Sequence, residues 1–413
     1  MTPVIDLTAA LVETPSPNPP GGERAVADVV TAALRDRGLP APTVLARDPT
    51  RPNLAVTVDF GPGGRHLCLS GHLDTKPVGD AGWSVDPLRA TLDGDRLYGL
   101  GAADMKGAVA AMIEAAAAVA AAPPPRGRLT LLFTADEEDG AAYGARHLAG
   151  GHLAEALAGA GVPAVDAVVI GEPGGIDADW DRLHRVSRGI ARLRVTVAGD
   201  QGHSSLAERT GAVNASVEMA RLLAAFADGF RPSVPPHEEL TGWAATVNAG
   251  LKVAGGVGYG VIPGEASFDA EVRLLPGMDR AAFDAELRAF LDQAGAGNPR
   301  LRASVGYDAP PCDWLAGTEV PADHPVAAAA RTALARVLGA APPDAVFPGT
   351  TDAAWLHGLA GLPTLPAVGP GLLSRCHGRD EWVSAGAVEQ AVAVYRELVA
   401  TFCPGAGPQR GTA

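Results

Sequence analysis

The sequence predicts an α/β domain that is interrupted by a smaller α+β module. Up to residue 188, buried apolar runs alternate with helical patterns. Over residues 189–306, strand-like segments instead alternate polar and apolar residues, and from residue 307 the pattern of buried runs and helices resumes. We therefore expect one domain formed by residues 1–188 and 307–413, and a second domain formed by residues 189–306.

The first domain should contain a sheet with helices on both faces. A helix is expected over residues 23–39, where apolar residues recur at helical spacing and Gly38 suits the helix end. Four strands are expected in the runs LAVTVDF, HLCLSGH, LTLLFTADEE and AVDAVVIGEPG. An Ala-rich helix from Ala108 separates the second and third runs, and a helical stretch over residues 141–161 separates the third and fourth.

The second domain should combine half-exposed strands with helices. The runs ARLRVTVAG and EASFDAEVRLL alternate polar and apolar residues, and helical patterns lie near residues 212–230 and 280–293. Beyond residue 307 a helix is expected over residues 325–338, and residues 404–413 should form a disordered tail.

Composition narrows the class of protein. The chain has 413 residues, is 47% hydrophobic and 19% charged, and carries a net charge of −14, which argues against nucleic acid or an anionic membrane as a partner. We read no signal peptide, and the most apolar helical run is short and carries Glu114. The four cysteines form no CxxC pair, so we expect reduced thiols in a cytoplasmic protein.

Histidines and acids gather where the strands of the first domain should end, which is where open α/β sheets bind ligands. The residues concerned are His72 and Asp74, Asp104, the acidic run of TADEEDG, Glu172 and His377. Taken singly, each has an ordinary explanation. Asp104 could cap the Ala-rich helix, and His72 with Asp74 could form a surface turn.

Taken together, these residues predict a metal centre. Nitrogen and oxygen ligands without thiolate suit zinc, with cobalt or manganese as substitutes. Five ligands fit two metals about 3.5–4 Å apart if Asp104 bridges them. Each metal then takes one histidine and one glutamate, and Glu137 is left over as a general base.

An ordered set of motifs makes the family recognisable: SGHLDT, GAADMKG, DEE, GEP, GHSS, VIPGEASFDAEVR, PGTTDAAW and CHGRDEWV. The sequence resembles the co-catalytic di-zinc hydrolases that include aminoacylase, acetylornithine deacetylase, succinyl-diaminopimelate desuccinylase and glutamate carboxypeptidase. This resemblance implies a zinc-exopeptidase-like three-layer α/β/α catalytic domain. It also implies that the inserted α+β domain is a ferredoxin-like lid through which the chain forms a homodimer.

The resemblance also assigns roles in the metal centre. It places His72 and Glu172 on one zinc, His377 and Glu138 on the other, and Asp104 between them. It makes Glu137 the base and proton shuttle, and Asp74 the residue that orients His72. The family has a non-proline cis peptide after the bridging Asp, so we expect one at Asp104–Met105. Asp136 and Asp139 receive no task, and helix-entry or solvated roles are the default.

Three residues outside the metal centre are assigned by the same resemblance. His203 matches a histidine that reaches the active site from the partner subunit and holds the oxyanion. Arg273 matches an arginine that binds the substrate carboxylate, and Thr350 matches a substrate-contacting position. The ordinary alternatives are a surface-loop role for His203 and an ion pair of Arg273 with Glu271 or Glu265.

Two positions depart from the family pattern. Gly260 stands where the family usually has Asn before the V-I-P segment, so an amide donor is missing. Leu100 replaces a charged residue in GLGAADMKG.

The expected function is cleavage of the N-acyl amide bond of an N-acylated amino acid or a related small metabolite that carries a carboxylate. The alternatives are a carboxypeptidase or dipeptidase, a non-catalytic binding protein on the same scaffold, and a hydrolase that removes a protecting acyl group in a specialised pathway.

Overall fold

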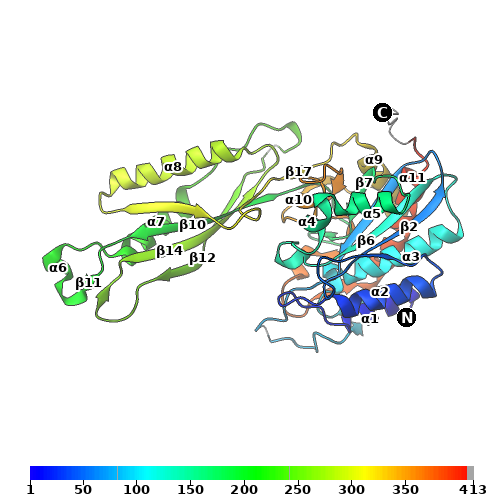
Figure 1. Cartoon of the computed structure of the whole chain (residues 1–413), viewed down its shortest axis with the longest axis horizontal. Coiled ribbons are helices and arrows are strands. Elements are labelled where there is room, and N and C mark those ends of the chain that lie inside the picture. Colours follow the sequence, from blue (N-terminus) through cyan, green and yellow to red (C-terminus); the bar gives the residue numbers. More distant parts are fainter. Residues whose placement is uncertain (81, 241, 407–413) are drawn as a thin grey trace. The chain divides into compact units, whose positions relative to one another are not determined.

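A computed structural model describes residues 1–80, 82–240 and 242–406. The chain divides into two compact units (Figure 1). Unit 1 comprises Met1–Ser187, Glu319–Phe347 and Thr351–Ala413, and unit 2 comprises Arg188–Thr318 and Pro348–Thr350. Most of the expected disordered tail, from residue 407 on, lies outside the described residues.

Unit 1 is built on a six-stranded mixed sheet. Its strand order is β1-β2-β6-β3-β7-β19, with β2 antiparallel to β6 and with β3 parallel to both β6 and β7. The strands are β1 (Thr43–Leu45), β2 (Asn53–Gly61), β3 (His66–His72), β6 (Gly127–Thr134), β7 (Ala167–Ile170) and β19 (Thr364–Leu365). Every residue of β3 is buried, as expected for a strand that is covered on both faces.

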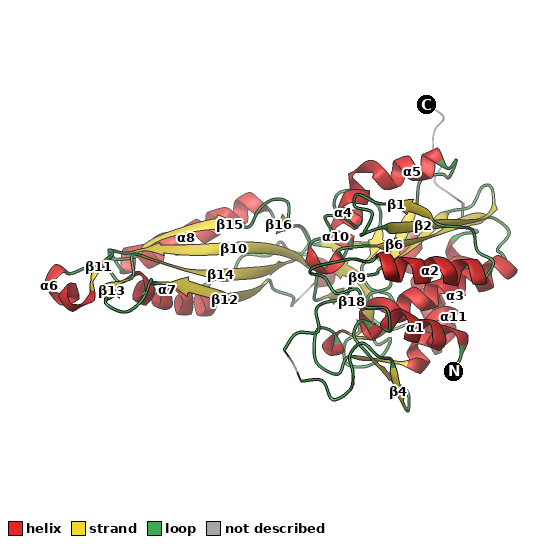
Figure 2. Ribbon diagram, turned by 60° about the horizontal axis from the view of Figure 1, so that its bottom comes forward, coloured by secondary structure: helices red, strands yellow, loops and turns green. Residues whose placement is uncertain are grey.

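Helices cover both faces of this sheet (Figure 2). One face carries α1 (Pro3–Val12), α2 (Arg24–Asp36), α3 (Gly107–Ala121) and α11 (Ala385–Phe402), and the other carries α4 (Ala145–His147) and α5 (Leu153–Gly159). The alanines of α3 are buried on almost every side, and their small side chains permit close packing against α11. The three-layer α/β/α arrangement is thus confirmed.

Of two helices expected from the sequence, one forms as predicted and the other is interrupted. Helix α9 (Pro325–Leu338) has the predicted bounds, with proline at its start and Gly339 in the left-handed region at its end. The expected helical stretch 141–161 is instead interrupted, because a π-helical turn at Leu148–His152 contains Gly151 with φ of 112°.

Short strands absent from the sequence prediction complete unit 1. They form a sheet of order β21-β5-β4, a sheet of order β17-β9-β18 and a pair β20-β8. Their bounds are β4 (Thr91–Asp93), β5 (Arg96–Tyr98), β8 (Pro173–Gly175), β9 (Leu183–Ser187), β17 (Thr318–Glu319), β18 (Asp344–Phe347), β20 (Gly369–Leu372) and β21 (Trp382–Ser384), and helix α10 covers Ala353–Leu356.

Unit 2 has the predicted ferredoxin-like topology. Chain order is β10 (Gly189–Ala198), α7 (Ala215–Gly229), β12 (Thr246–Gly255), β14 (Glu265–Leu274), α8 (Arg280–Gly297) and β15 (Arg302–Tyr307). The antiparallel sheet has the order β12-β14-β10-β15. Phe226 of α7 and Phe283 of α8 belong with the inward residues of β10 and β14 to one apolar core.

The boundary between the units differs from the expected one. The second unit continues to Thr318 rather than ending at residue 306, because β15 and the short strand β16 (Trp314–Leu315) both pair with β10. The remaining elements of unit 2 are β11 (Gly202–His203), β13 (Val261–Ile262) and α6 (Ala207–Thr210).

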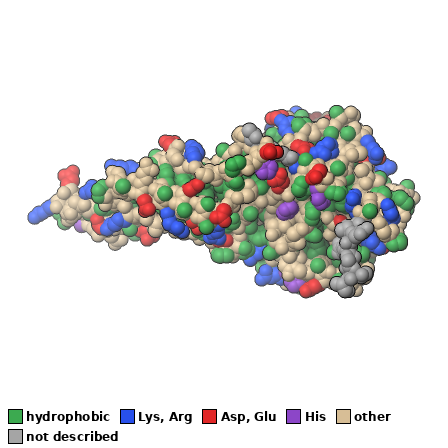
Figure 3. Space-filling model, turned by 90° about the horizontal axis from the view of Figure 1, so that it is seen from above, with side chains coloured by type: hydrophobic (Ala, Val, Ile, Leu, Met, Phe, Trp, Pro, Cys, Tyr) green, Lys and Arg blue, Asp and Glu red, His purple; other side chains and the backbone are tan. Residues whose placement is uncertain are grey.

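No helix among the described residues is both long enough and apolar enough to cross a membrane. On the face drawn in Figure 3, acidic and basic side chains are interspersed rather than separated by sign.

Candidate metal centre

Three neighbouring strands bring candidate ligands to one edge of the unit 1 sheet. Because β3 runs parallel to β6 and β7, their carboxyl ends lie at the same edge. His72 is the last residue of β3 and is in register with Thr134, the last residue of β6. Glu137 and Glu138 follow β6, and Glu172 follows β7.

Asp104 lies between the two histidines. Its Oδ1 is 2.9 Å from Nε2 of His72, and its Oδ2 is 3.2 Å from Nε2 of His377. Glu172 Oε1 lies 3.6 Å from the same nitrogen of His72, and Glu138 Oε1 lies 3.3 Å from that of His377. The structure therefore brings the five residues together as two His–Glu pairs on either side of one aspartate.

The loop that carries Asp104 is held from behind by Glu381. One carboxylate oxygen of Glu381 accepts the backbone N–H groups of Ala103 and Asp104, at 3.0 and 3.1 Å, and the other accepts that of Gly101. The expected cis peptide at Asp104–Met105 is present. Helix α3 begins only at Gly107, so the alternative of Asp104 as its N-cap is wrong.

The acidic turn TADEEDG is fixed by Asp74. After β6 ends at Thr134, Glu137–Asp139 form a single 3₁₀ turn. The carboxylate of Asp74 accepts the backbone N–H groups of Glu137 and Glu138, at 3.1 and 3.0 Å. Asn18 donates a further hydrogen bond to Asp74 at 2.9 Å. Asp74 thus positions the backbone of both candidate glutamates.

Asp74 also contacts His72, although mainly through its backbone. Nδ1 of His72 lies 2.9 Å from the carbonyl oxygen of Asp74 and 3.6 Å from its carboxylate. A hydrogen bond from Nδ1 to this carbonyl oxygen leaves Nε2 to face Asp104 and Glu172. Asp74 therefore orients the imidazole of His72, and it also fixes the turn that carries Glu137 and Glu138.

A solvated role for Asp136 is wrong, whereas the residue does stand at the entry of the 3₁₀ turn Glu137–Asp139, although its side chain does not cap that turn. This aspartate is buried and accepts hydrogen bonds from Asn18 and from the backbone N–H of Tyr143, while Arg51 lies 3.0 Å away. Asp139 is exposed, as a solvated residue would be. The left-handed backbone of Asp136, with φ of 67°, turns the chain at the end of β6.

Crowded carboxylates dominate the electrostatics. Burial raises the pKa of Glu137 well above its usual value, His72 opposes this, and Asp352 and Glu138 raise it further. Burial and Asp104 likewise raise the pKa of Glu172. Burial raises the pKa of Asp352 to about 7, and one of its carboxylate oxygens is buried without a hydrogen-bond partner among the described residues.

Positively charged side chains offset part of this negative charge. Burial alone lowers the pKa of His72, but its contacts with Asp104 and Asp74 raise the pKa well above its usual value. Hydrogen bonding to Asp104 and Glu138 raises the pKa of His377 to about 10. Lys76 Nζ lies 3.1 Å from Glu138 Oε2 and also bonds the carbonyl oxygen of that residue.

This donor set fits divalent metal ions. Ligand atoms of His72, Glu137 and Glu172 lie within 4.8 Å of one another, as do those of His72, Asp104 and Glu138. Imidazole nitrogen and carboxylate oxygen without thiolate are the donors that zinc and related metals take. Metal ligands must be deprotonated, so loading the raised-pKa groups of this cluster would release protons.

Three predicted substrate residues lie in unit 2. His203 is exposed, and its Nδ1 lies 2.8 Å from the hydroxyl of Ser205. Arg273 forms an ion pair with Glu271, as the ordinary alternative holds, and also donates to Thr350 Oγ1 at 3.3 Å. The Thr350 hydroxyl in turn donates to the carbonyl oxygen of Arg188 at 2.8 Å.

Several residues around the centre had no assigned role from the sequence. Asn18, Lys76, Asp352 and Glu381 are distant in the chain from the residues that they contact or influence. Arg188 lies beside Arg273 and Thr350: its carbonyl oxygen accepts the Thr350 hydroxyl, and burial and the charge of Arg273 lower the pKa of its guanidinium. The same guanidinium lies 5.2 Å from the ring of Trp243. A weak signal existed for Asp352 and Glu381, since both lie within motifs of the family.

Comparison with known proteins agrees with this geometry. Residues 68–401 match the model of peptidase family M20/M25/M40. The succinyl-diaminopimelate desuccinylase of Stenotrophomonas maltophilia strain K279a is 31% identical over 406 residues, covering 97% of this chain and 99% of its own. The desuccinylase of Gluconacetobacter diazotrophicus is 34% identical over 278 residues, covering 66% of this chain and 67% of its own.

Solved structures show the same fold. An M20 family metallo-carboxypeptidase of Sulfolobus solfataricus superposes with a TM-score of 0.77 at 17% identity, over 97% of this chain and 99% of its own. A Bacillus subtilis protein described as a dinuclear metal binding peptidase gives 0.65 at 16% identity, over 96% of each chain. From its matches in sequence and fold, the chain belongs to peptidase family M20/M25/M40 and is a hydrolase of amide or peptide bonds.

Proposed function

We propose that this protein is a two-metal amidohydrolase that cleaves the N-acyl bond of an N-acylated amino acid. The observation that carries the proposal is the Asp104 carboxylate, which faces a histidine from each of its two oxygens. Each histidine is accompanied by one glutamate, so the site offers two half-sites of the same residue composition. Such a shared carboxylate suits a pair of metals rather than one.

Zinc is the proposed metal, with cobalt or manganese able to replace it. His72, Glu172 and Asp104 would hold one ion, and His377, Glu138 and Asp104 the other. When bound, the ions polarise the scissile carbonyl and lower the pKa of water.

Glu137 is the proposed general base. It follows Asp136 on the turn that Asp74 fixes, and its ligand atom lies within 4.8 Å of those of His72 and Glu172. Burial among other carboxylates raises its pKa, which favours a group that both accepts and returns a proton. It takes the proton of the attacking water and delivers it to the leaving amine as the C–N bond breaks. The products are a carboxylate and a free amino acid.

Unit 2 supplies the proposed substrate contacts. Arg273 and Thr350 take the substrate carboxylate, and Arg188 adds a second guanidinium to that group. His203 is proposed to hold the oxyanion from the partner subunit. Its exposure is what a residue that contacts a substrate from another chain requires.

A homodimer through unit 2 is proposed on the same grounds. Strand β12 lies at one end of the unit 2 sheet and has no further partner strand among the described residues. Its Leu251 and Val253 are 63% and 53% exposed. An unpaired edge with apolar side chains is a surface that a second copy can cover.

An N-succinyl amino acid is the first substrate to test, because curated relatives at 30% identity or more are desuccinylases. A carboxypeptidase or dipeptidase would use the same metal ligands and the same carboxylate contacts.

A substrate panel separates these possibilities. N-Succinyl, N-acetyl and N-carbamoyl amino acids and dipeptides are incubated with the Zn²⁺- or Co²⁺-loaded protein, and amine release is measured. We expect release from an N-acyl amino acid, loss of activity with EDTA, and recovery when metal is restored. Full activity of the metal-free protein would refute the two-metal proposal, and preference for dipeptides would refute the deacylase.

A further inference from the structure

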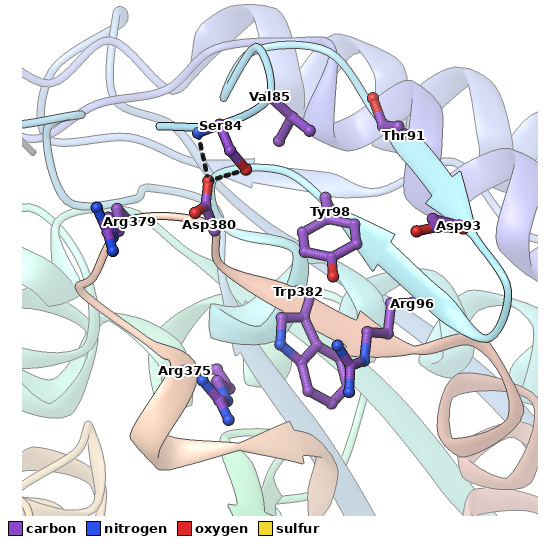
Figure 4. Close-up of a pocket in the computed structure, with 10 residues that line it drawn as sticks. All are labelled: Ser84, Val85, Thr91, Asp93, Arg96, Tyr98, Arg375, Arg379, Asp380 and Trp382. Carbon is purple, nitrogen blue, oxygen red and sulfur yellow. Dashed lines mark hydrogen bonds between the residues drawn. The ribbon is translucent and has the colours of Figure 1, made fainter. Parts of the chain in front are cut away.

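A pocket that none of the candidate metal ligands lines lies on unit 1, on the outer face of the three-stranded sheet β21-β5-β4 (Figure 4). Its volume is about 580 Å³. The register pairs Trp382 with Tyr98 and Tyr98 with Thr91, so their side chains share one face of the sheet. The opposite face points into the core, where Leu97 and Val383 are buried. These three short strands thus make a pocket floor on one side and core on the other.

Three arginines surround this aromatic floor. The guanidinium of Arg96 lies 4.6 Å from the ring centroid of Trp382, and that of Arg375 lies 5.7 Å from it. Arg379 also lines the pocket, and all three are exposed (Figure 4). None of the three lies within ion-pair distance of a carboxylate in the described part of the chain, although hydrogen bonding to Tyr98 and the charge of Asp93 raise the pKa of Arg96. The indole holds two guanidiniums in place without neutralising them.

The pocket has fewer acidic than basic side chains, and one of the acids is already hydrogen-bonded. Three arginines face two aspartates, Asp93 and Asp380. Asp380 Oδ1 accepts hydrogen bonds from the backbone N–H and the hydroxyl of Ser84, at 2.7 and 3.0 Å. This contact joins the loop after His377 to the segment at Ser84 and closes one wall of the pocket. The pocket therefore carries an excess of positive side chains, although the chain as a whole has a net charge of −14.

The wall of the pocket is a strained segment. Both His377 and Asp380 have positive φ, 59° and 56°, a conformation that non-glycine residues seldom adopt without a constraint. Along the same segment, neighbouring side chains point to opposite sides. Glu381 holds the Asp104 loop, whereas its neighbour Trp382 faces the pocket.

We propose that this pocket binds a small organic oxyanion, a polycarboxylate or a phosphate ester, at a site separate from the metal centre. Guanidiniums that are ordered by an aromatic ring and lack carboxylate partners suit carboxylate and phosphate oxygens, which they bind by paired N–H donors. The half-buried rings of Tyr98 and Trp382, which line the pocket, accommodate the carbon skeleton of such a molecule.

The test uses the metal-loaded full-length protein and isothermal titration calorimetry. The probes are propane-1,2,3-tricarboxylate and phenyl phosphate, with the uncharged propane-1,2,3-tricarboxamide as control. The pocket variant is Arg96→Gln, and Arg379→Gln replaces it if that variant does not fold. Arg89→Gln is the matched control, because Arg89 is exposed but does not line the pocket. Arg273→Gln reports binding at the proposed substrate site instead.

We expect saturable binding of at least one anion and none of the tricarboxamide. Removing one guanidinium from the pocket should weaken binding at the pocket about tenfold or more, whereas Arg89→Gln should leave it unchanged and Arg273→Gln should remove only a separate binding event at the proposed substrate site. Binding of one probe alone identifies which oxyanion the pocket prefers. Two results would overturn the proposal: no saturable heat with either anion, or binding that is lost in Arg273→Gln and retained in Arg96→Gln.

Discussion

The candidate metal centre in unit 1 and the three residues of unit 2 that are proposed to contact substrate differ in how they are held. In the metal centre, the backbone beside Asp104 is bound by Glu381 and the glutamate turn is bound by Asp74. In unit 2, His203 is exposed and is contacted by Ser205 of its own turn. The candidate metal ligands are therefore preorganised by contacts from distant parts of unit 1, and Arg273 and Thr350 are held by Glu271 and Arg188, whereas His203 is held only within its own turn.

The largest effect should come from the base. Glu137→Gln removes the group that moves the proton, so we expect kcat to fall by about three orders of magnitude while both metals stay bound. The measurements are steady-state kinetics and metal content. The matched variant Glu138→Gln should instead lose bound metal, since Glu138 faces His377. If Glu137→Gln loses a metal and Glu138→Gln retains both, the two roles are exchanged.

The buried histidine His184 of unit 1 should make the free energy of unfolding fall in acid. Burial lowers the pKa of His184 to about 4, from 6.5, although hydrogen bonding to the Gly174 carbonyl opposes the shift. Between pH 6.5 and 4 the unfolded chain binds a proton that the folded chain excludes, so the free energy of unfolding falls as pH falls through this window. This residue alone accounts for a loss of about 3 kcal/mol.

The measurement is denaturant unfolding at pH 7, 5.5 and 4 for the wild type and His184→Gln. The variant should show a shallower dependence on pH, and His152→Gln, at an exposed histidine, should keep the wild-type slope. Equal slopes for wild type and His184→Gln would exclude this residue as a source of the acid limit.

Metal removal tests how far the preorganised centre depends on cations. The crowded carboxylates repel one another, so metal ions should stabilise the folded chain by about 2.7 kcal/mol at a free concentration of one hundred times Kd. Thermal unfolding with EDTA and with added Zn²⁺ or Co²⁺ measures this difference. An unchanged melting temperature would mean that these residues do not form a metal site in the folded protein.

The smallest effect should come from unit 2. Arg273→Lys keeps the charge but loses the forked donors, so KM should rise about tenfold to a hundredfold with metal content unchanged. Arg194→Lys is the control, because Arg194 lies on the same sheet in an exposed ion pair with Asp269. An unchanged KM would assign Arg273 to its structural contact with Glu271 alone.

The sequence predicted the candidate ligands because each follows a recognisable strand or loop motif. His72 and Glu172 follow buried apolar runs that form the parallel strands β3 and β7, and Asp104 precedes the Ala-rich helix, so the sequence indicates where they meet. Helix α9 and the ferredoxin-like order of unit 2 followed in the same way from local periodicity.

The supporting contacts could not be predicted, because they join residues that are far apart in the chain. Asn18 bonds Asp74 across 56 positions, and Glu381 bonds Asp104 across 277. The strands β4, β5 and β21 are only three residues long, too short for periodicity to reveal. The burial of Asp136 could not be predicted for a similar reason, since its partner Arg51 is distant in the sequence.

Gly260 offers a way to rebuild the missing amide. It has a φ of 84°, and a Cβ placed there would meet no atom within 4 Å. Its carbonyl accepts the N–H of Ser204, next to His203. Asparagine is among the side chains that best tolerate this backbone region. Gly260→Asn would therefore supply the amide usual in the family at a position with room for its side chain, and the ratio of kcat/KM before and after the change would show whether the substrate of this protein uses that donor.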